Sequence, residues 1–325
     1  MSNLTDELSG NKVEIKQKFF HWRTLIGFVI AIFVIYIFLT KFDLNKAIAN
    51  ISSANILLLI IATIAFYASL PLRGWRWDIL LKPSGNAIGW KPLSHYYFIS
   101  WFANAILPAR IGDIYRAYLL KKNNDISVSL SLGVIFSERI IDLAVTAILL
   151  VLSGFYFWGS LKETQESRYL FWGVILVIVL VVLFVIMFLA LPWITKKAPQ
   201  SIKSKLESFR GGMFKSPALL PGITVLTVCI WMSEALRLYL VLLAFGIKSG
   251  FLLAVFISQA SLILMALPIS PAGLGLVELL MLKLLASSDI SISLAGAITL
   301  TDRLISYWSL VIFGGIVYIF SARTR

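Results

Sequence analysis

The sequence predicts an all-α protein that crosses a membrane several times. Hydrophobic residues make up 59% of its 325 residues and charged residues only 14%, and the apolar residues gather in long runs. A water-soluble enzyme or a nucleic-acid reader is excluded, because a chain this apolar would expose large hydrophobic patches in water. The single cysteine, Cys229, cannot form an internal disulfide, and we expect it to pack within its apolar run.

Six apolar runs are long enough, or nearly so, to cross a bilayer as helices, since a span needs about 20 apolar residues. Two further runs, Leu93–Leu107 and Phe251–Leu267, are shorter, contain polar residues and end in Leu-Pro. No small-residue cleavage site adjoins the first long run, so we expect it to remain as an uncleaved span. The six long runs are Leu25–Thr40, Ser53–Leu72, Ile126–Phe157, Leu170–Ile194, Leu219–Ile247 and Ile290–Phe320.

The basic residues, which give the chain a net charge of +13, discriminate between two topologies, because lysine and arginine collect on the cytoplasmic side of a membrane. If the two short runs enter and leave on the same face, 20 of the 29 basic residues lie with both termini in the cytoplasm. If all eight runs cross, the basic segments Arg110–Lys122 and Lys196–Lys215 fall outside. We therefore predict six full spans with two re-entrant Leu-Pro hairpins, and eight spans are the alternative.

Two segments of the chain resemble each other. Asp125–Ile140 aligns without a gap on Asp289–Leu304, six of the 16 positions are identical, and a Leu-Pro break precedes each segment. In the six-span topology the two halves are inverted in the membrane, which is a common plan of transporters, and chance similarity between apolar helices is the alternative. We predict one membrane domain over residues 24–320, with repeats at about 53–157 and 219–320, between cytoplasmic residues 1–23 and 321–325.

Ionisable residues inside the predicted spans are informative, since each costs at least about 2.5 kcal/mol there unless it is paired or lines a watery cavity. One interpretation is a polar cavity in which Arg139 and Arg303, related by the repeat, bind an anionic headgroup. The other is a set of buried ion pairs that lock helices together, and both can hold because arginine pairs with carboxylates and phosphates alike. The residues concerned are Glu138, Arg139, Asp142, Glu234, Arg237, Asp302 and Arg303.

The first Leu-Pro break lies between Asn104 and Arg116, and Pro108 should end the entering helix there. On the returning arm, which also contains Gly112, the spacing of Arg110, Asp113 and Arg116 places them on one helical face, opposite an apolar face. A phosphate site and an ordinary interfacial helix explain this pattern equally well.

The second break is more specific, because two prolines and two glycines within eight residues cannot continue a helix in lipid. Its free N–H groups could hold an anionic oxygen. Glu278, which follows it, is either a partner for a buried arginine or a proton-carrying group. The residues of this loop are Pro268, Ser270, Pro271, Gly273 and Gly275.

A cluster of cationic and aromatic residues, Arg73, Trp75, Arg76 and Trp77, ends the second predicted span. We interpret it as an anchor at headgroup depth, where such residues collect, and it could also gather lipid phosphates. Motifs for nucleotide binding, zinc proteases or serine hydrolases are missing from the sequence. We therefore expect no catalytic residues, no metal and no cofactor.

Together these motifs resemble the flippase-like family of integral membrane proteins named after the transmembrane region of lysylphosphatidylglycerol synthetase. The resemblance runs from about Thr24 to Phe320, and it departs from the family pattern mildly at Asp113, where glutamate is more frequent, and at Ala272, where glycine is frequent. It rests on Arg73–Trp77, Asn104–Arg116, Glu138–Asp142 and Pro268–Glu278, in the family's order.

In the two-part enzymes of that family, the membrane region flips aminoacylated phosphatidylglycerol and a soluble domain makes it. The resemblance therefore implies a flippase of the cytoplasmic membrane of a prokaryote, without lysyltransferase activity. Its substrate would be an anionic phospholipid, aminoacyl-phosphatidylglycerol or a polyprenyl-phosphate-linked lipid. The alternatives are a membrane transferase with Asp113 or Glu278 as base, an accessory subunit of an envelope lipid or glycan biosynthesis enzyme, or an ion-coupled solute carrier. A homo-oligomer is compatible with each.

Overall fold

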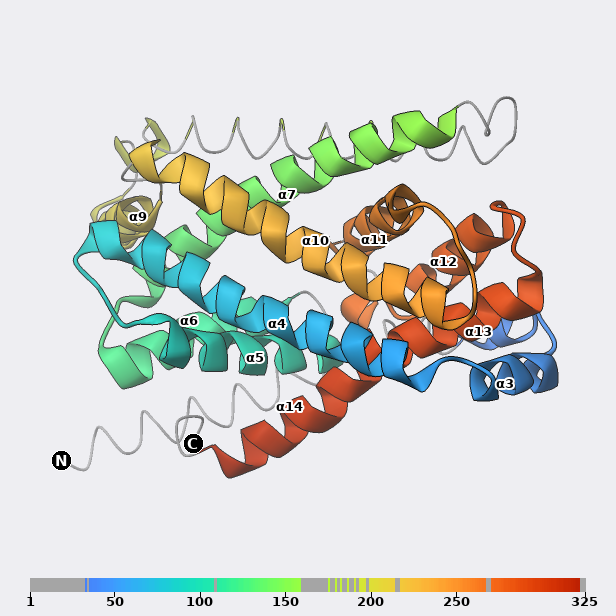
Figure 1. Cartoon of the computed structure of the whole chain (residues 1–325). Helices are drawn as coiled ribbons and strands as arrows, with labels where there is room; N and C mark the ends of the chain where they lie inside the picture. Colours follow the sequence, from blue (N-terminus) through green and yellow to red (C-terminus); the bar gives the residue numbers. More distant parts are fainter. Residues whose placement is uncertain are drawn as a thin grey trace.

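The computed structural model describes residues 33, 35–107, 110–158, 175, 179, 182, 186, 190, 193–196, 199–213, 217–266 and 270–321. Regular structure in these residues is helical throughout, and no strand occurs among them (Figure 1). The predicted all-α class is therefore confirmed.

Four of the six long apolar runs fold as described helices, and three of these are long and apolar enough to cross a membrane: Ile56–Ser84, Leu220–Ala244 and Ile292–Phe320. The predicted spans Leu25–Thr40 and Leu170–Ile194 lie mostly outside the described residues. The four runs correspond to α4 (Ile56–Leu81), α7 (Val128–Trp158), α10 (Leu220–Ala244), and the continuous unit of α13 (Ile292–Arg303), the π-helical turn η4 (Leu304–Trp308) and α14 (Ser309–Phe320).

Helices α4 and α10 lie side by side through the middle of the molecule (Figure 1). The Asn55 side chain begins α4 by accepting the N–H groups of Leu57 and Leu58, which have no partner within the helix. The helix then continues through Pro71 and ends at Leu81, nine residues beyond the predicted end at Leu72. Arg73–Trp77 therefore lies inside a helix rather than after one.

Each short apolar run forms the first helix of a packed pair. α5 (Trp90–Ile106) packs on α6 (Ile111–Asn124), and α11 (Phe251–Ala266) packs on α12 (Leu276–Ala286) after the short turn η3 (Pro271–Gly273). Two helices that meet at a break are what a re-entrant hairpin requires, while the number of crossings stays a prediction. Pro108 and Pro268, at the two breaks, lie outside the described residues.

Gly112 explains how closely α6 approaches α5. A Cβ atom at this position would lie 2.1 Å from the backbone oxygen of Ser100 and 2.7 Å from Oδ1 of Asn104. A methyl group cannot fit there, so the glycine permits the contact that folds the first helix pair onto itself.

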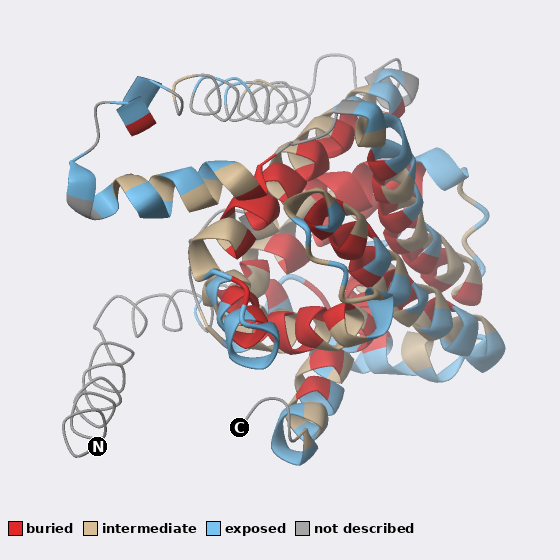
Figure 2. Cartoon of the chain, turned by 90° about the vertical axis from the view of Figure 1, so that its left-hand side faces the viewer, coloured by how far each residue is buried: buried red, intermediate tan, exposed pale blue. Residues whose placement is uncertain are grey.

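Buried apolar side chains form two main clusters, one drawn mostly from α4, α5, α6 and α7 and the other mostly from α10, α11, α12 and α13. Burial concentrates toward the centre of the bundle (Figure 2). Large apolar side chains on outward faces, such as Ile64 and Leu152, are each 62% exposed. That arrangement suits a protein surrounded by lipid.

Four smaller described elements pack around this frame. α3 (Leu44–Ser52) lies against α13, and α9 (Gln200–Gly212) lies against α7, where Gly133 and Gly212 allow the two backbones to approach closely. The single turns η1 (Lys82–Ser84) and η2 (Pro217–Leu219) adjoin α4 and α10. None of the four contributes a side chain to the site described next.

Candidate functional site: a buried charge network around a cavity

Glu138 of α7 is the centre of the charge network in the first half of the chain. Its side chain is fully buried, with Arg76 of α4 at 3.0 Å and Arg116 of α6 at 3.2 Å. Tyr97 of α5 donates its hydroxyl hydrogen to the same carboxylate at 2.9 Å. One carboxylate thus joins four helices, which is how a charge can be buried without remaining unpaired.

Arg139, the next residue, joins two further carboxylates. Its Nη2 lies 3.1 Å from Oδ2 of Asp113 on α6, and its Nη1 lies 3.4 Å from Oδ2 of Asp142 on α7. Asp142 also pairs with Arg76 at 2.6 Å. The Arg139 side chain is 21% exposed, the largest exposed fraction in this network.

The charged face of α6 points inward. Arg116 is fully buried, whereas Ile114 and Tyr118 on the opposite face are 55% and 49% exposed. An interfacial helix would place its charges in water and its apolar face in the membrane boundary. That interpretation of the pattern is wrong, because the charges of α6 pair with those of α7 inside the protein.

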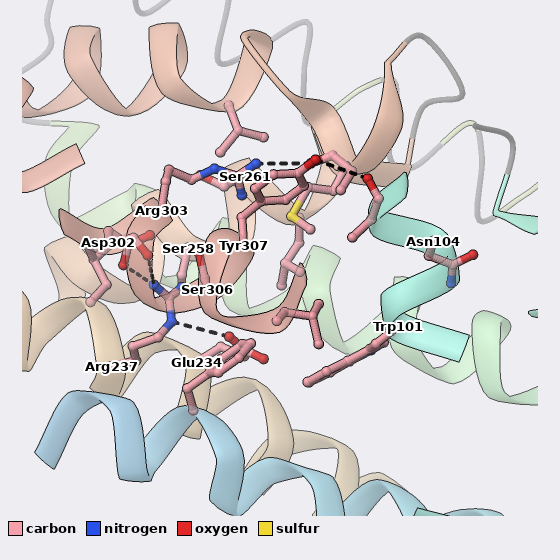
Figure 3. A pocket seen from close by; sticks show the side chains of 18 of the residues that line it. Trp101, Asn104, Glu234, Arg237, Ser258, Ser261, Asp302, Arg303, Ser306 and Tyr307 are labelled. Carbon is pink, nitrogen blue, oxygen red and sulfur yellow. Dashed lines mark hydrogen bonds and ion pairs between the residues drawn. The ribbon is translucent and has the colours of Figure 1, made fainter. Parts of the chain in front are cut away.

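The second half of the chain holds its charges more simply, in one short chain of contacts and one separate pair. Arg237 of α10 lies between Glu234 and Asp302 (Figure 3) and contacts both, with Nε 3.5 Å from the nearer oxygen of Glu234. Arg303 donates from Nε to Oε1 of Glu278 at 2.7 Å. Glu278 is therefore the partner of a buried arginine, the first of the two roles predicted for it.

The loop before α12 uses its N–H groups internally. Gly275 donates to Oε2 of Glu278 at 2.6 Å, Gly273 donates to the carbonyl of Ser270, and Leu274 donates to the carbonyl of Pro271. The prediction that these N–H groups are free for an external anion is wrong for these three. The one anionic oxygen among their acceptors belongs to the protein's own Glu278.

Positions that the sequence repeat relates make corresponding contacts. Glu138 and Asp302 each pair with an arginine of the helix that begins their half, Arg76 and Arg237. Arg139 and Arg303 each pair with an acid in the first turn of the helix after a break, Asp113 and Glu278. The backbone matches too: φ is positive directly before each of these helices, 53° at Arg110 and 85° at Gly275, and it is 55° at Asp125 and 60° at Asp289.

The prediction of a headgroup anchor at the end of the second span is wrong for three of its four residues. Arg73 is 2% exposed and Arg76 and Trp77 are fully buried, so only Trp75, at 49%, can face headgroups. Because α4 continues past Leu72, its inner face carries the other three side chains into the protein. The number of basic residues that lie in cytoplasmic loops is lower than predicted as well, because Arg73, Arg76 and Arg116 are interior residues.

Arg73 occupies an aromatic cage at the boundary between the two halves. Its guanidinium carbon lies 4.5 Å from the ring centroid of Trp101 on α5 and 4.8 Å from that of Trp231 on α10. Its Nη2 donates to Glu234 at 3.1 Å. Cation–π contacts and one ion pair replace the water that a buried guanidinium loses.

A cavity of about 150 Å³ opens between these networks. Arg110, Arg139, Arg237 and Arg303, the arginines predicted to share a cavity, all line it, as does Asn104. Asp113, Glu138, Asp142 and Glu278 do not line the cavity but pair with Arg139 or Arg303 of its wall, and Arg116 lies behind the wall with Asp113 and Glu138. Figure 3 shows Asn104 and Trp101 from α5 on one side and residues from α10, α11 and α13 on the other.

The sequence reasoning missed part of the wall. Arg73 was assigned to the surface, although its three-residue spacing from Arg76 within an apolar helix is a signal that both face inward. Ser258 and Ser261 interrupt an apolar run but carry no charge to mark them. The cavity residues missed in this way are Arg73, Tyr97, Trp101, Trp231, Ser258, Ser261, Ser306 and Tyr307.

Several buried donors around the cavity have no hydrogen-bond partner among the described residues. They include Nε of Arg73, Nε of Arg139 and Nε1 of Trp231. Within the same part of the chain, no cluster of three or more histidine, cysteine or acidic residues is placed to hold a metal ion. The site is therefore rich in donors, which suits an oxygen-bearing anion.

Comparison with known proteins assigns the chain to a family. Residues 24–314 match the family described as the lysylphosphatidylglycerol synthase TM region. The chain belongs to this family. It is an integral membrane protein, and the resemblance found in its motifs is confirmed.

Relatives of the chain occur in archaea, and several of them are named as UPF0104 membrane proteins. The chain is 35% identical over 219 residues to a UPF0104 membrane protein of Methanocaldococcus jannaschii. The aligned residues are 67% of this chain and 93% of the relative. It is 25% identical over 313 residues to a UPF0104 membrane protein of Methanothermobacter thermautotrophicus, with 89% of this chain and 91% of the relative aligned. It is also 29% identical over 139 residues to the glycosyltransferase AglD of Haloferax volcanii, covering 42% of this chain and 22% of that protein.

Proposed function

We propose that the protein moves an anionic lipid between the leaflets of the cytoplasmic membrane by binding the headgroup phosphate in the central cavity. The observation that carries this proposal is the convergence of five arginines, from both halves of the chain, on one cavity inside a membrane protein. They are Arg73, Arg110, Arg139, Arg237 and Arg303. Charged residues at such depth are expensive and are kept where they serve a substrate.

When no headgroup is bound, the carboxylates beside the cavity compensate the charges of the arginines. Arg139 and Arg303 each have an acidic partner, Asp113 at 3.1 Å and Glu278 at 2.7 Å. A phosphate offers the same forked acceptor geometry as a carboxylate, so it can take over part of each arginine's hydrogen bonding. Exchange between the two kinds of partner would bind the headgroup without leaving an arginine unpaired.

The size of the cavity limits what enters it. An engineered cavity of about 150 Å³ in another protein accommodates benzene, so a space of this size takes a phosphate and a few attached atoms. Acyl or polyprenyl chains must stay in the surrounding lipid while the headgroup crosses.

The breaks in the helices supply places where the halves can move. Arg110 and Ala272 adopt left-handed backbone conformations next to the cavity, and the π-helical turn η4 directly follows Arg303. Such irregular turns often occur at functional sites. Together with the corresponding contacts in the two halves, they support the predicted inverted repeat and a rocking motion around the site.

The likeness to AglD favours one second candidate. Because part of this chain is similar to part of a protein named as a glycosyltransferase, the bound lipid could be a polyprenyl-phosphate-linked sugar, and the protein could be an accessory subunit of envelope glycan synthesis. In that case it would bind such a lipid and support a partner enzyme without moving the lipid itself.

Proteoliposomes test the proposal. Fluorescent phosphatidylglycerol, lysyl-phosphatidylglycerol and polyprenyl phosphate are scored for movement out of the outer leaflet with a membrane-impermeant quencher. Arg139→Gln and Arg303→Gln should each slow movement at least about tenfold, because a charge-assisted hydrogen bond contributes about 1.5–3 kcal/mol. Arg210→Gln removes the same charge from the exposed side of α9 and should leave the rate unchanged.

Unchanged movement in both cavity variants would overturn the site assignment. If the wild-type protein moves none of the lipids but binds polyprenyl phosphate, the accessory role replaces lipid movement as the function.

A further inference from the structure

Arg110 differs from every other arginine of the buried network. Among the described residues, no carboxylate oxygen lies within 4 Å of it, whereas each of the other six arginines has at least one such partner. Among the same residues its side chain makes one hydrogen bond, from Nη2 to the carbonyl of Met265 at 3.5 Å, the weak limit of such a bond. The six paired arginines are Arg73, Arg76, Arg116, Arg139, Arg237 and Arg303.

The backbone holds Arg110 at the cavity. Its φ of 53° lies in the left-handed region, which is unfavourable for a residue with a side chain. The residue directly precedes α6 and lines the cavity, so the strained turn brings a cation to this place. The residue at the same place in the second half, directly before α12, is Gly275, which has a positive φ but carries no charge.

The network therefore carries one surplus positive charge. Seven arginines face six carboxylates, and the seventh arginine is Arg110. A buried site is most favourable when the bound charge balances its own, because an uncompensated charge away from water is strongly destabilised. One negative charge balances this network, and a second would remain in excess.

We propose that Arg110 is the anchor for the headgroup phosphate and that the site selects singly charged phosphodiesters over doubly charged phosphomonoesters. This inference rests on the proposed function and narrows its substrate class. Phosphodiesters such as phosphatidylglycerol carry one negative charge on the phosphate. A phosphomonoester, whose second pKa is about 6, carries nearly two charges at pH 8.

Two lipids that differ by one methyl group test the charge rule directly. Phosphatidylmethanol is a phosphodiester and phosphatidic acid is the matching monoester, so both fit the same cavity. With fluorescent forms of each in proteoliposomes at pH 8, the wild-type protein should move phosphatidylmethanol at least about tenfold faster, since the second charge lacks a partner. Protein-free liposomes give the background rate of each lipid.

Variants change the surplus charge in both directions. Arg110→Gln removes it and should reduce movement of phosphatidylmethanol at least about tenfold, whereas Arg110→Lys retains it and should keep the preference. Glu234→Gln, which removes a carboxylate beside the cavity, raises the surplus to two and should shift the preference toward phosphatidic acid. Arg210→Gln on exposed α9 is the matched control. Shifts of the melting temperature with short-chain forms of both lipids report binding independently of movement.

The outcomes separate this inference from the proposed function. Equal movement of the two lipids by the wild-type protein would overturn the charge rule while leaving lipid movement intact. Wild-type rates in Arg110→Gln, together with slow movement in Arg139→Gln, would overturn the role of Arg110 alone. If the wild-type protein neither moves nor binds either lipid, the proposed function fails and the inference fails with it.

Discussion

The two halves of the chain bury equivalent residues but connect them differently. Glu138 in the first half lies within 4 Å of Arg76, Arg116 and Arg139. Its counterpart in the second half, Asp302, has Arg237 as its one ion-pair partner among the described residues. The first half is thus an interlocked network, whereas the second is an open chain of contacts from Glu234 through Arg237 to Asp302, with the separate pair of Arg303 and Glu278.

The backbone shows the same contrast. α7 runs for 31 residues without interruption, whereas the corresponding helix of the second half passes from α13 through the π-helical turn η4 into α14. A network in which every group has several partners resists rearrangement more than isolated pairs do. We infer that the first half is the more rigid of the two and that the second half, although related in sequence, can rearrange more easily.

The largest expected effect comes from removing the central carboxylate. Glu138→Gln leaves arginines of three helices without full compensation and should reduce the free energy of unfolding by about 3–5 kcal/mol. Asp302→Asn should cost less, because it releases one arginine that Glu234 still contacts. Thermal unfolding in detergent measures both, and Glu207→Gln on exposed α9 is the control. Equal losses of stability in the two variants would contradict the claim that the charges of the two halves are connected differently.

A smaller effect is expected at the α5–α6 contact. Gly112→Ala places a methyl group 2.1 Å from the backbone oxygen of Ser100, so the helices must separate at a cost of about 1–3 kcal/mol. Gly222→Ala, where a Cβ atom meets nothing within 4 Å, is the matched control within α10. Both are measured by thermal unfolding, and similar melting temperatures for the two variants would show that the hairpin is not closely packed.

The smallest effect concerns the aromatic cage around Arg73. Trp101→Phe keeps a ring beside Arg73 but weakens the cation–π contact, and it should cost about 0.5–2 kcal/mol. The same change at Trp75, which is 49% exposed, should have little effect on unfolding. If the cost at Trp101 is unchanged when Arg73 is replaced by methionine, the contact with Arg73 does not contribute.

Much of the fold was predictable because it depends on local pattern. The lengths of the apolar runs located α5, α7, α10 and α11 to within a few residues, since a membrane helix must satisfy its own backbone. The end of α4 was misplaced because Arg73–Trp77 also has the composition of a headgroup anchor. Composition cannot show whether such a cluster faces lipid or protein, which depends on the neighbouring helices.

The candidate site was predictable where charge marked it. Arg110, Arg139, Arg237 and Arg303 attracted attention because ionisable groups are costly in an apolar helix, and all four line the cavity. The aromatic and serine residues of the wall carry no such mark. The pairing pattern also depends on distances between helices, so the solitary position of Arg110 could not be read from the sequence.

The most direct test of the central claim is movement of phosphatidylglycerol by the purified wild-type protein in liposomes, followed by accessibility to a membrane-impermeant quencher. We predict that the wild-type protein removes the protection of inner-leaflet lipid at a rate well above the protein-free background. The double variant Arg139→Gln/Arg303→Gln should abolish this movement, and Arg210→Gln should not. Protection that stays at background with the wild-type protein, or movement that persists in the double variant, would contradict the claim.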